Sequence, residues 1–255
     1  MAQKIQSINL MLSGGKPLLA SYLREQGYSS QLLSKYVKSR WMEMPYKGVY
    51  IKPKTKISMG GLLSALIFQK KMPMHIAGLD ALRMFGYFEQ IPFINKIITL
   101  YSSRRIFIPK WVKKYEKKNK VKIKLVCSKL FMTDTFIKEN ELDGFSIPAS
   151  IPERAIFEAL NDIKSSAEFY EYIKVFELIV NLKYEYLDTL LKECSSIKIK
   201  RLFLYVSQLF NKPYFKKINI NRYKLGSGAR TLFTGIDEMK YDSKYKIMVP
   251  KTRQS

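Results

Sequence analysis

The chain has 255 residues, of which 47% are hydrophobic and 13% aromatic, and this composition excludes wholesale disorder. It carries 45 Lys and Arg against 21 Asp and Glu, and the net charge of +24 predicts a polyanionic partner such as DNA or RNA. No apolar run approaches the roughly 18 residues that span a bilayer, and the N-terminus lacks a signal-peptide pattern, so a membrane surface is the weaker candidate.

The two cysteines, Cys127 and Cys194, are far apart in the sequence and are flanked by apolar residues. They have no spacing typical of a disulfide framework or a metal site. Both thiols are therefore predicted to be reduced and buried, in a protein of the cytoplasm. No metal ion and no cofactor is expected.

The first 40 residues carry the pattern of a helix-turn-helix. A weakly helical stretch over residues 1–12 precedes a predicted helix over residues 17–26, which Gly27 is expected to end. A second helix is predicted from Ser29 or Ser30, either of which can cap its N-terminus. One face of this helix is apolar and is expected to be buried, and it consists of Leu32, Leu33, Tyr36 and Val37.

After this helix, residues 41–43 and 49–51 read as two short strands around a turn over residues 45–48. This is the plan of a winged helix-turn-helix, whose second helix enters the major groove of DNA. A small helical subdomain with an ordinary hairpin is the alternative. The charge favours DNA binding, because residues 1–80 hold 12 basic and 3 acidic residues. The residues predicted to contact DNA are Ser30, Gln31, Ser34, Lys35, Lys38 and Arg40 on the recognition helix and Tyr46, Lys47 and Lys52 on the wing.

The next stretch is assigned to the same N-terminal unit, so that a winged-helix DNA-binding domain over residues 1–86 is predicted. Residues 60–69 indicate a buried helix that supports the DNA-binding unit. His75, the only histidine, is interpreted as a structural residue in a short strand, because nothing near it in the sequence offers a metal ligand or a catalytic partner.

A mixed α/β segment is predicted over residues 87–150. Residues 97–101 and 121–126 read as strands, and the second alternates apolar residues with lysine. Residues 110–124 contain eight lysines in fifteen positions. This run is interpreted either as a solvated loop or as an auxiliary patch for a phosphate backbone.

The last part, residues 151–255, is predicted to be a helical bundle that ends in a β-hairpin, which makes the fold class α+β. With the mixed segment it forms a C-terminal domain over residues 87–255. The expected elements are helices from residue 152 and over 169–180, 184–194 and 198–210, a glycine loop over 224–230 and hairpin strands over 231–233 and 245–249.

The first turn of the helix predicted over residues 198–210 contains three cations, Lys198, Lys200 and Arg201. Positive charge at this end opposes the helix dipole, so a bound anion or nearby acidic helices are expected to offset it. Residues 151–193 are the acidic part of the chain, with 5 basic and 9 acidic residues.

Several blocks of this sequence occur in the order typical of one protein family. In the C-terminal half they are IPERAIFEAL (151–160), KIKRLFLY (198–205), KLGSGAR (224–230) and YKIMVPK (245–251). In the N-terminal half they are YLREQGYS (22–29), YVKSRW (36–41), GVY (48–50) and AGLDALRMFG (77–86). With these blocks the chain resembles, over nearly its whole length, the AbiEi antitoxins of type IV bacterial toxin–antitoxin systems.

The resemblance implies a cytoplasmic antitoxin whose winged helix represses its own operon by binding inverted repeats, as a monomer in solution that pairs on DNA. It also implies a C-terminal domain that neutralises a nucleotidyltransferase-type toxin, typically without a stable complex. Ala229 departs from the basic or polar residue expected in the glycine loop. The residues singled out for the antitoxin surface are Lys198, Lys200, Arg201, Lys224, Ser227, Arg230 and Lys246.

Two other functions stay open. Gly226-Ser227-Gly228 could hold phosphate through backbone N–H groups and support phosphoryl transfer to the toxin. The sequence has no Walker-type loop, no G-x-S-x-G motif and no paired metal ligands, so the protein is predicted not to be an enzyme. General nucleic-acid binding, including RNA, would also explain the charge, but no RNP-like or KH-like motif supports it.

Overall fold

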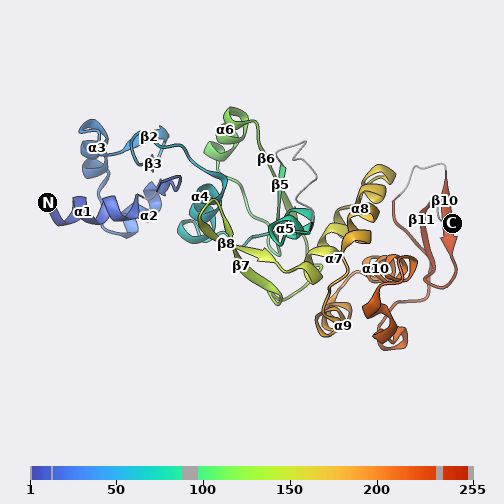
Figure 1. Ribbon diagram of the computed structural model, residues 1–255. Helices are drawn as coiled ribbons and strands as arrows, with labels where there is room; N and C mark the ends of the chain where they lie inside the picture. The colour runs from blue at the N-terminus through green and yellow to red at the C-terminus, as the bar shows by residue number, and fades with distance from the viewer. Residues whose placement is uncertain (1, 13, 88–96, 234–237, 252–255) are drawn as a thin grey trace.

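The chain runs from one end of an elongated molecule to the other (Figure 1). This computed structural model describes residues 2–12, 14–87, 97–233 and 238–251. Small helices and a three-stranded sheet form the N-terminal end, a five-stranded sheet lies in the middle, and helices followed by a second three-stranded sheet form the C-terminal end. The predicted α+β class is confirmed.

The N-terminal unit is a helix-turn-helix followed by a wing. Its strands pair in the order β1-β3-β2. Its core contains Leu23 of α2 and Leu33 of α3. The elements are α1 (Ala2–Met11), β1 (Leu18–Leu19), α2 (Ala20–Glu25), α3 (Ser30–Lys38), β2 (Glu43–Tyr46) and β3 (Val49–Ile51).

Two details of this unit differ from the prediction. Leu18 and Leu19 were assigned to a helix, but they pair with Tyr50 and Val49 of β3 and so add a third strand to the wing. The first wing strand begins at Glu43 instead of residue 41. Its pairing with β3 is irregular between Glu43 and Tyr46, where Pro45 has no N–H to donate.

The middle of the chain forms a mixed sheet in the order β6-β5-β4-β8-β7. The outer pair β5 and β6 is parallel, and the hairpin of β7 and β8 is antiparallel. The strands are β4 (His75–Ile76), β5 (Ile97–Ser102), β6 (Lys122–Cys127), β7 (Ile137–Leu142) and β8 (Phe145–Ser150), and the helices are α4 (Met59–Ser64), the π-helical η1 (Ala65–Gln69), α5 (Gly78–Met84) and α6 (Lys110–Asn119).

The first ten residues of the lysine-rich run form helix α6, and its last three begin strand β6, so most of the run is not a loop. Val112 and Tyr115 are buried on one side of α6, and this packing overrides the weak apolar signal of the sequence.

Of the two cysteines, Cys127 at the end of β6 is exposed, so only Cys194 is buried as predicted. Burial raises the pKa of the Cys194 thiol to about 11.

The C-terminal end confirms the series of helices and corrects the hairpin. Strand β11 pairs antiparallel with β10 and parallel with β9, so residues 231–233 are not the partner strand of a hairpin. The elements are α7 (Pro152–Asp162), α8 (Ser166–Leu178), α9 (Tyr184–Glu193), α10 (Ile197–Leu209), the 3-10 helices η2 (Pro213–Lys217) and η3 (Ile220–Arg222), β9 (Arg230–Thr231), β10 (Met239–Asp242) and β11 (Ile247–Pro250).

One large hydrophobic core extends from Leu62 of α4 to Val249 of β11. Helix α4, strand β4 and helix α5 contribute to it, so the predicted division at residue 86 cuts through this core. The side chain of Gln69 joins the core to the N-terminal unit, because its amide accepts from the Leu19 N–H at 2.8 Å and donates to the Pro17 carbonyl at 2.8 Å. The helical segment at residues 60–69 thus contacts the N-terminal unit through Gln69, while it packs mainly against the sheet.

Gly61 allows this close approach of α4 to the N-terminal unit. A Cβ at Gly61 would lie 2.0 Å from the Gly15 carbonyl oxygen, which no side chain can tolerate. The same carbonyl accepts a hydrogen bond from the Ser58 N–H at 3.0 Å.

Within the described residues, none of the helices combines the length and the apolar character needed to cross a membrane.

Candidate nucleic-acid interface and C-terminal cations

Helix α3 is fixed by its cap and by its apolar face. The Ser29 hydroxyl accepts from the Leu32 N–H at 3.2 Å, which satisfies one of the free donors of the first turn. Leu33 and Tyr36 are buried, while Leu32 and Val37 are half-buried beside them. The predicted apolar face is confirmed.

The opposite face of α3 is polar and exposed. Its residues line one open hollow of about 510 Å³, and they are Ser30, Gln31, Ser34, Lys35 and Lys38. The structure therefore brings together five of the six residues predicted on this helix. Arg40, the sixth, is exposed one residue beyond Ser39, the C-cap, with a φ of 59°.

The wing residues divide into two groups. Lys47 lies in the turn between β2 and β3, Lys52 follows β3, and both side chains are exposed. Tyr46 is half-buried, and its ring centroid lies 5.9 Å from that of Trp111 on α6. Burial raises the pKa of Tyr46. Its ring thus packs against the body of the molecule, a contact that the sequence did not indicate.

Arg201 is the most buried of the C-terminal cations, with 1% of its surface exposed. Its guanidinium donates to four backbone carbonyls, whose dipoles stabilise the charge and whose hydrogen bonds fix the glycine loop on α10. Burial lowers the pKa of Arg201, and the nearby charge of Arg230 lowers it further. The four acceptors are the carbonyls of Leu225 (2.8 Å), Gly226 (2.8 Å), Gly228 (2.6 Å) and Lys246 (2.9 Å).

The structure does not place Arg201 and Lys200 on an exposed surface. Lys200 is buried too, which lowers the pKa of its amine. Lys198 is half-buried and donates to the Leu232 carbonyl at 3.2 Å. The remaining residues of the predicted antitoxin surface are exposed, and they are Lys224, Ser227, Arg230 and Lys246. At the start of α10 the charge of Arg201 is therefore partly offset by backbone carbonyls, three in the glycine loop and one at Lys246.

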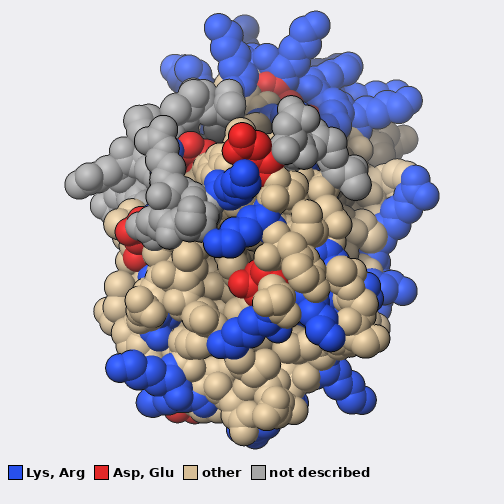
Figure 2. All heavy atoms as spheres, turned by 90° about the vertical axis from the view of Figure 1, so that its right-hand side faces the viewer, with Lys and Arg blue, Asp and Glu red and all other residues tan. Residues whose placement is uncertain are grey.

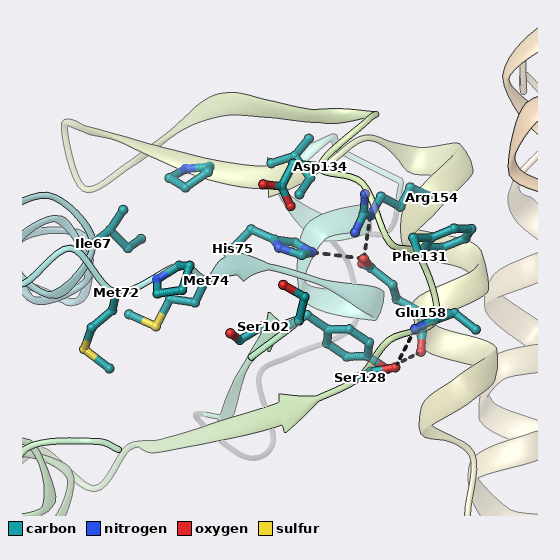
Figure 3. A pocket seen from close by; sticks show the side chains of 16 residues that line it. Ile67, Met72, Met74, His75, Ser102, Ser128, Phe131, Asp134, Arg154 and Glu158 are labelled. Atoms are coloured by element: carbon teal, nitrogen blue, oxygen red, sulfur yellow. Dashed lines mark hydrogen bonds and ion pairs between the residues drawn. The ribbon is translucent and has the colours of Figure 1, made fainter. Parts of the chain in front are cut away.

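A second polar site lies in the middle of the molecule, where β4 meets α7. Figure 3 shows the side chains of His75 and Arg154 pointing at the carboxylate of Glu158. His75 Nε2 is 3.0 Å and Arg154 Nε is 2.9 Å from Glu158 Oε1, and all three residues are buried. They line a cavity of about 250 Å³ together with apolar side chains, which include Met72 and Met74, and with polar ones, which include Ser128 and Asp134.

The pKa of Glu158 reflects this arrangement. Burial alone would raise it, but the charges and hydrogen bonds of His75 and Arg154 lower it below the ordinary value. Arg154 also donates to the carbonyls of Thr133 (2.8 Å) and Thr135 (2.7 Å). The cluster therefore connects α7 with β4 and with the loop before β7.

Sequence reasoning missed Glu158 and Arg154 as partners of His75. The four-residue spacing between Arg154 and Glu158 in a helix was the available signal, since such residues lie on one face. The partnership with His75 bridges 83 residues and has no local signature. Among the residues that the structure describes, no group of three or more His, Cys, Asp or Glu side chains is placed to hold a metal ion.

Comparison with known proteins identifies the family. A model described as an AbiEi antitoxin N-terminal domain of transcriptional regulators matches residues 1–93, and a model described as a transcriptional regulator, AbiEi antitoxin of a type IV toxin–antitoxin system, matches residues 95–250. The crystal structure of the RV2827C protein from Mycobacterium tuberculosis is similar in fold, with a TM-score of 0.59 at 14% identity over 92% of this chain and 86% of that chain. No curated protein matches the sequence. Because the two family models cover almost the whole sequence, the chain belongs to the AbiEi antitoxins of type IV toxin–antitoxin systems, a family of transcriptional regulators.

Proposed function

We propose that the protein represses its own operon by placing α3 in the major groove of inverted repeats upstream of the gene. The exposed polar face of α3, opposite the buried Leu33 and Tyr36, is the observation that carries this proposal. Gln31 can read adenine with its amide, and Lys35 or Lys38 can reach guanine. The hydroxyls of Ser30 and Ser34 are suited to phosphate oxygens.

The wing and the end of α3 complete the proposed DNA contact. Arg40, Lys47 and Lys52 are exposed and can hold phosphates on either side of the groove. Tyr46 has its ring against Trp111, so any part that it takes in DNA binding is through its outer edge. The protein is proposed to be a monomer in solution, two copies of which bind the two halves of an inverted repeat.

A gel-shift titration tests the repressor function. We expect the DNA directly upstream of the gene to bind at least about a thousandfold more tightly than scrambled DNA at the same salt concentration. The variant Gln31→Ala/Lys35→Ala is expected to lose most of this preference, because each lost base contact costs about 1–3 kcal/mol. The control Gln6→Ala/Lys138→Ala removes the same groups at exposed positions elsewhere and should bind as the unmodified protein does. Equal binding of both DNAs by the unmodified protein would contradict the proposal.

We further propose that the exposed C-terminal cations neutralise a nucleotidyltransferase-type toxin, without a stable complex and without a catalytic step. Lys224, Arg230 and Lys246 surround the loop that Arg201 holds, and their charges are free to face an acidic or nucleic-acid partner. The hydrogen bonds of Arg201 to the glycine loop and to Lys246 give this charge a defined position. Lys198 is half-buried and donates to the Leu232 carbonyl just after β9, so it is not part of this exposed set.

Co-expression with the toxin tests this second function. The variant Lys224→Gln/Arg230→Gln/Lys246→Gln is expected to lose growth rescue while it keeps operator binding, because the loop and the winged helix lie at opposite ends of the molecule (Figure 1). The control Lys216→Gln/Lys217→Gln/Lys240→Gln removes the same charge from exposed positions in the C-terminal part. Full rescue by the loop variant would remove these residues from the antitoxin function.

A further inference from the structure

Helix α6 carries a stripe of lysines along one face. Val112 and Tyr115 are buried on the opposite face, and Trp111 is half-buried. The stripe follows the spacing i, i+3, i+4, i+7, i+8, and every member is exposed. We call it the α6 stripe, and it consists of Lys110, Lys113, Lys114, Lys117 and Lys118.

The α6 stripe is unfavourable for the isolated helix. Lysines four residues apart repel each other, and the first turn has no acidic residue to offset Lys110 and Lys113. In the described part of the chain, the ion pairs include one member of the stripe, Lys113, whose amine lies 2.9 Å from Glu116 Oε2. A polyanion bound along the other lysines would relieve this repulsion.

Helix α6 is attached directly to the wing. The rings of Tyr46 and Trp111 are in contact, and the Tyr115 hydroxyl donates to the Ile57 carbonyl at 3.3 Å. A groove of about 330 Å³ lies between the wing, the segment after it and α6, and its polar lining includes Lys56 and Lys118 beside one carboxylate, that of Glu43. That carboxylate accepts from the Lys54 N–H at 3.0 Å.

Helix α6 and the winged helix lie on the same side of the molecule. In Figure 1, α3, the wing strands β2 and β3, and α6 all lie along the upper side. Figure 2, turned about the vertical axis, shows Lys and Arg side chains projecting from this upper side. A straight DNA duplex bound to α3 and the wing can therefore continue past α6.

We propose that the α6 stripe binds the phosphate backbone of the same operator duplex, beyond the wing, so that the protein covers more DNA than a winged helix alone. This inference rests on the proposed repressor function and adds a second element to its interface. From Lys110 to Lys118 the helix rises about 12 Å, over which one DNA strand places about three or four phosphates. These contacts carry no sequence information, so they strengthen binding to every duplex.

The test is the salt dependence of DNA binding by Lys110→Gln/Lys114→Gln/Lys117→Gln/Lys118→Gln, which leaves the ion pair of Lys113 intact. Each phosphate contact makes the slope of log K against log salt more negative by about 0.9, so without these contacts the slope should be less steep by about 3 for operator and scrambled DNA alike. The preference for operator DNA should stay unchanged. The matched control removes four exposed lysines elsewhere and should keep the slope, and it is Lys129→Gln/Lys138→Gln/Lys216→Gln/Lys217→Gln.

The position of the contact is tested by shortening the operator. The unmodified protein should lose affinity when the flank beside the wing is removed, and the α6 variant should be insensitive to this removal. An unchanged salt slope in the α6 variant would overturn the inference, as would a loss of RNA binding with DNA binding unchanged. A reduced slope on both DNAs in a protein that never prefers operator DNA would support the α6 stripe and contradict the repressor function, so the two failures are distinguishable.

Discussion

Replacing Arg201 by methionine is expected to lower the free energy of unfolding by about 3–4 kcal/mol, because it leaves several carbonyls without their charged donor. The side chain is 1% exposed and makes four hydrogen bonds to the backbone of the glycine loop and of the turn before β11. Methionine fills part of the space but donates nothing. Urea unfolding of the full chain measures the effect.

The matched control is Arg230→Met, since Arg230 is exposed and donates to the carbonyl of its neighbour Ala229. We expect this change to alter stability by no more than about 0.5 kcal/mol. Arg201→Lys should be almost as destabilising as Arg201→Met, because one ammonium group cannot serve four carbonyls spread around a planar guanidinium. Wild-type stability in Arg201→Met combined with loss of toxin neutralisation would instead favour the surface role suggested by the sequence.

Helix α3 could be predicted from sequence because its determinants are local. Ser29 caps α3 three residues before the N–H that it accepts from, and Leu33 and Tyr36 lie one turn apart on the same face. Once the buried face is known, the exposed face follows from the helical period. Each of these relations spans fewer than five residues.

The C-terminal site could be predicted only in part, because its partners are distant in sequence. Arg201 bonds carbonyls that lie 24 to 45 residues further along the chain. Without knowledge of those acceptors, a cation in the first turn of a helix is interpreted as an exposed charge, and Arg201 was therefore assigned to the surface. The helix α6 was not predicted from the lysine-rich run for a related reason. The residues that bury Val112 and Tyr115 come from elsewhere in the large core, so the local sequence does not show that one side of this segment is buried.

The pairing of the C-terminal strands shows the same limit. The pattern at residues 231–233 and 245–249 predicted a hairpin, but β9 joins β11 in parallel and β10 takes the antiparallel position. A strand of two residues has no alternation from which its direction could be read. Local patterns therefore predicted the elements better than their partners.

Replacing Glu158 by glutamine should be the most destabilising change in the middle of the molecule, with a loss of about 3–5 kcal/mol at pH 7. Arg154 is itself buried, and without the carboxylate its charge would keep the carbonyls of Thr133 and Thr135 and the ring of Phe131, all of them uncharged partners. The control is Glu171→Gln, whose ion pair with Lys174 is exposed and should contribute no more than about 1 kcal/mol.

The pH dependence identifies the charge of Glu158 as the cause. Because its pKa is lower in the folded state than the ordinary value of 4.5, the stabilisation is present above that value and is lost as the pH falls through the folded-state pKa. The free energies of unfolding of the unmodified protein and of Glu158→Gln should therefore differ most above pH 4.5, and the difference should shrink below it. Titration of the other carboxylates cancels in this comparison, because both proteins share them. A difference that stays constant from pH 7 to pH 3 would mean that glutamine acts by misfitting the site, and not by removing the charge that Arg154 and His75 surround.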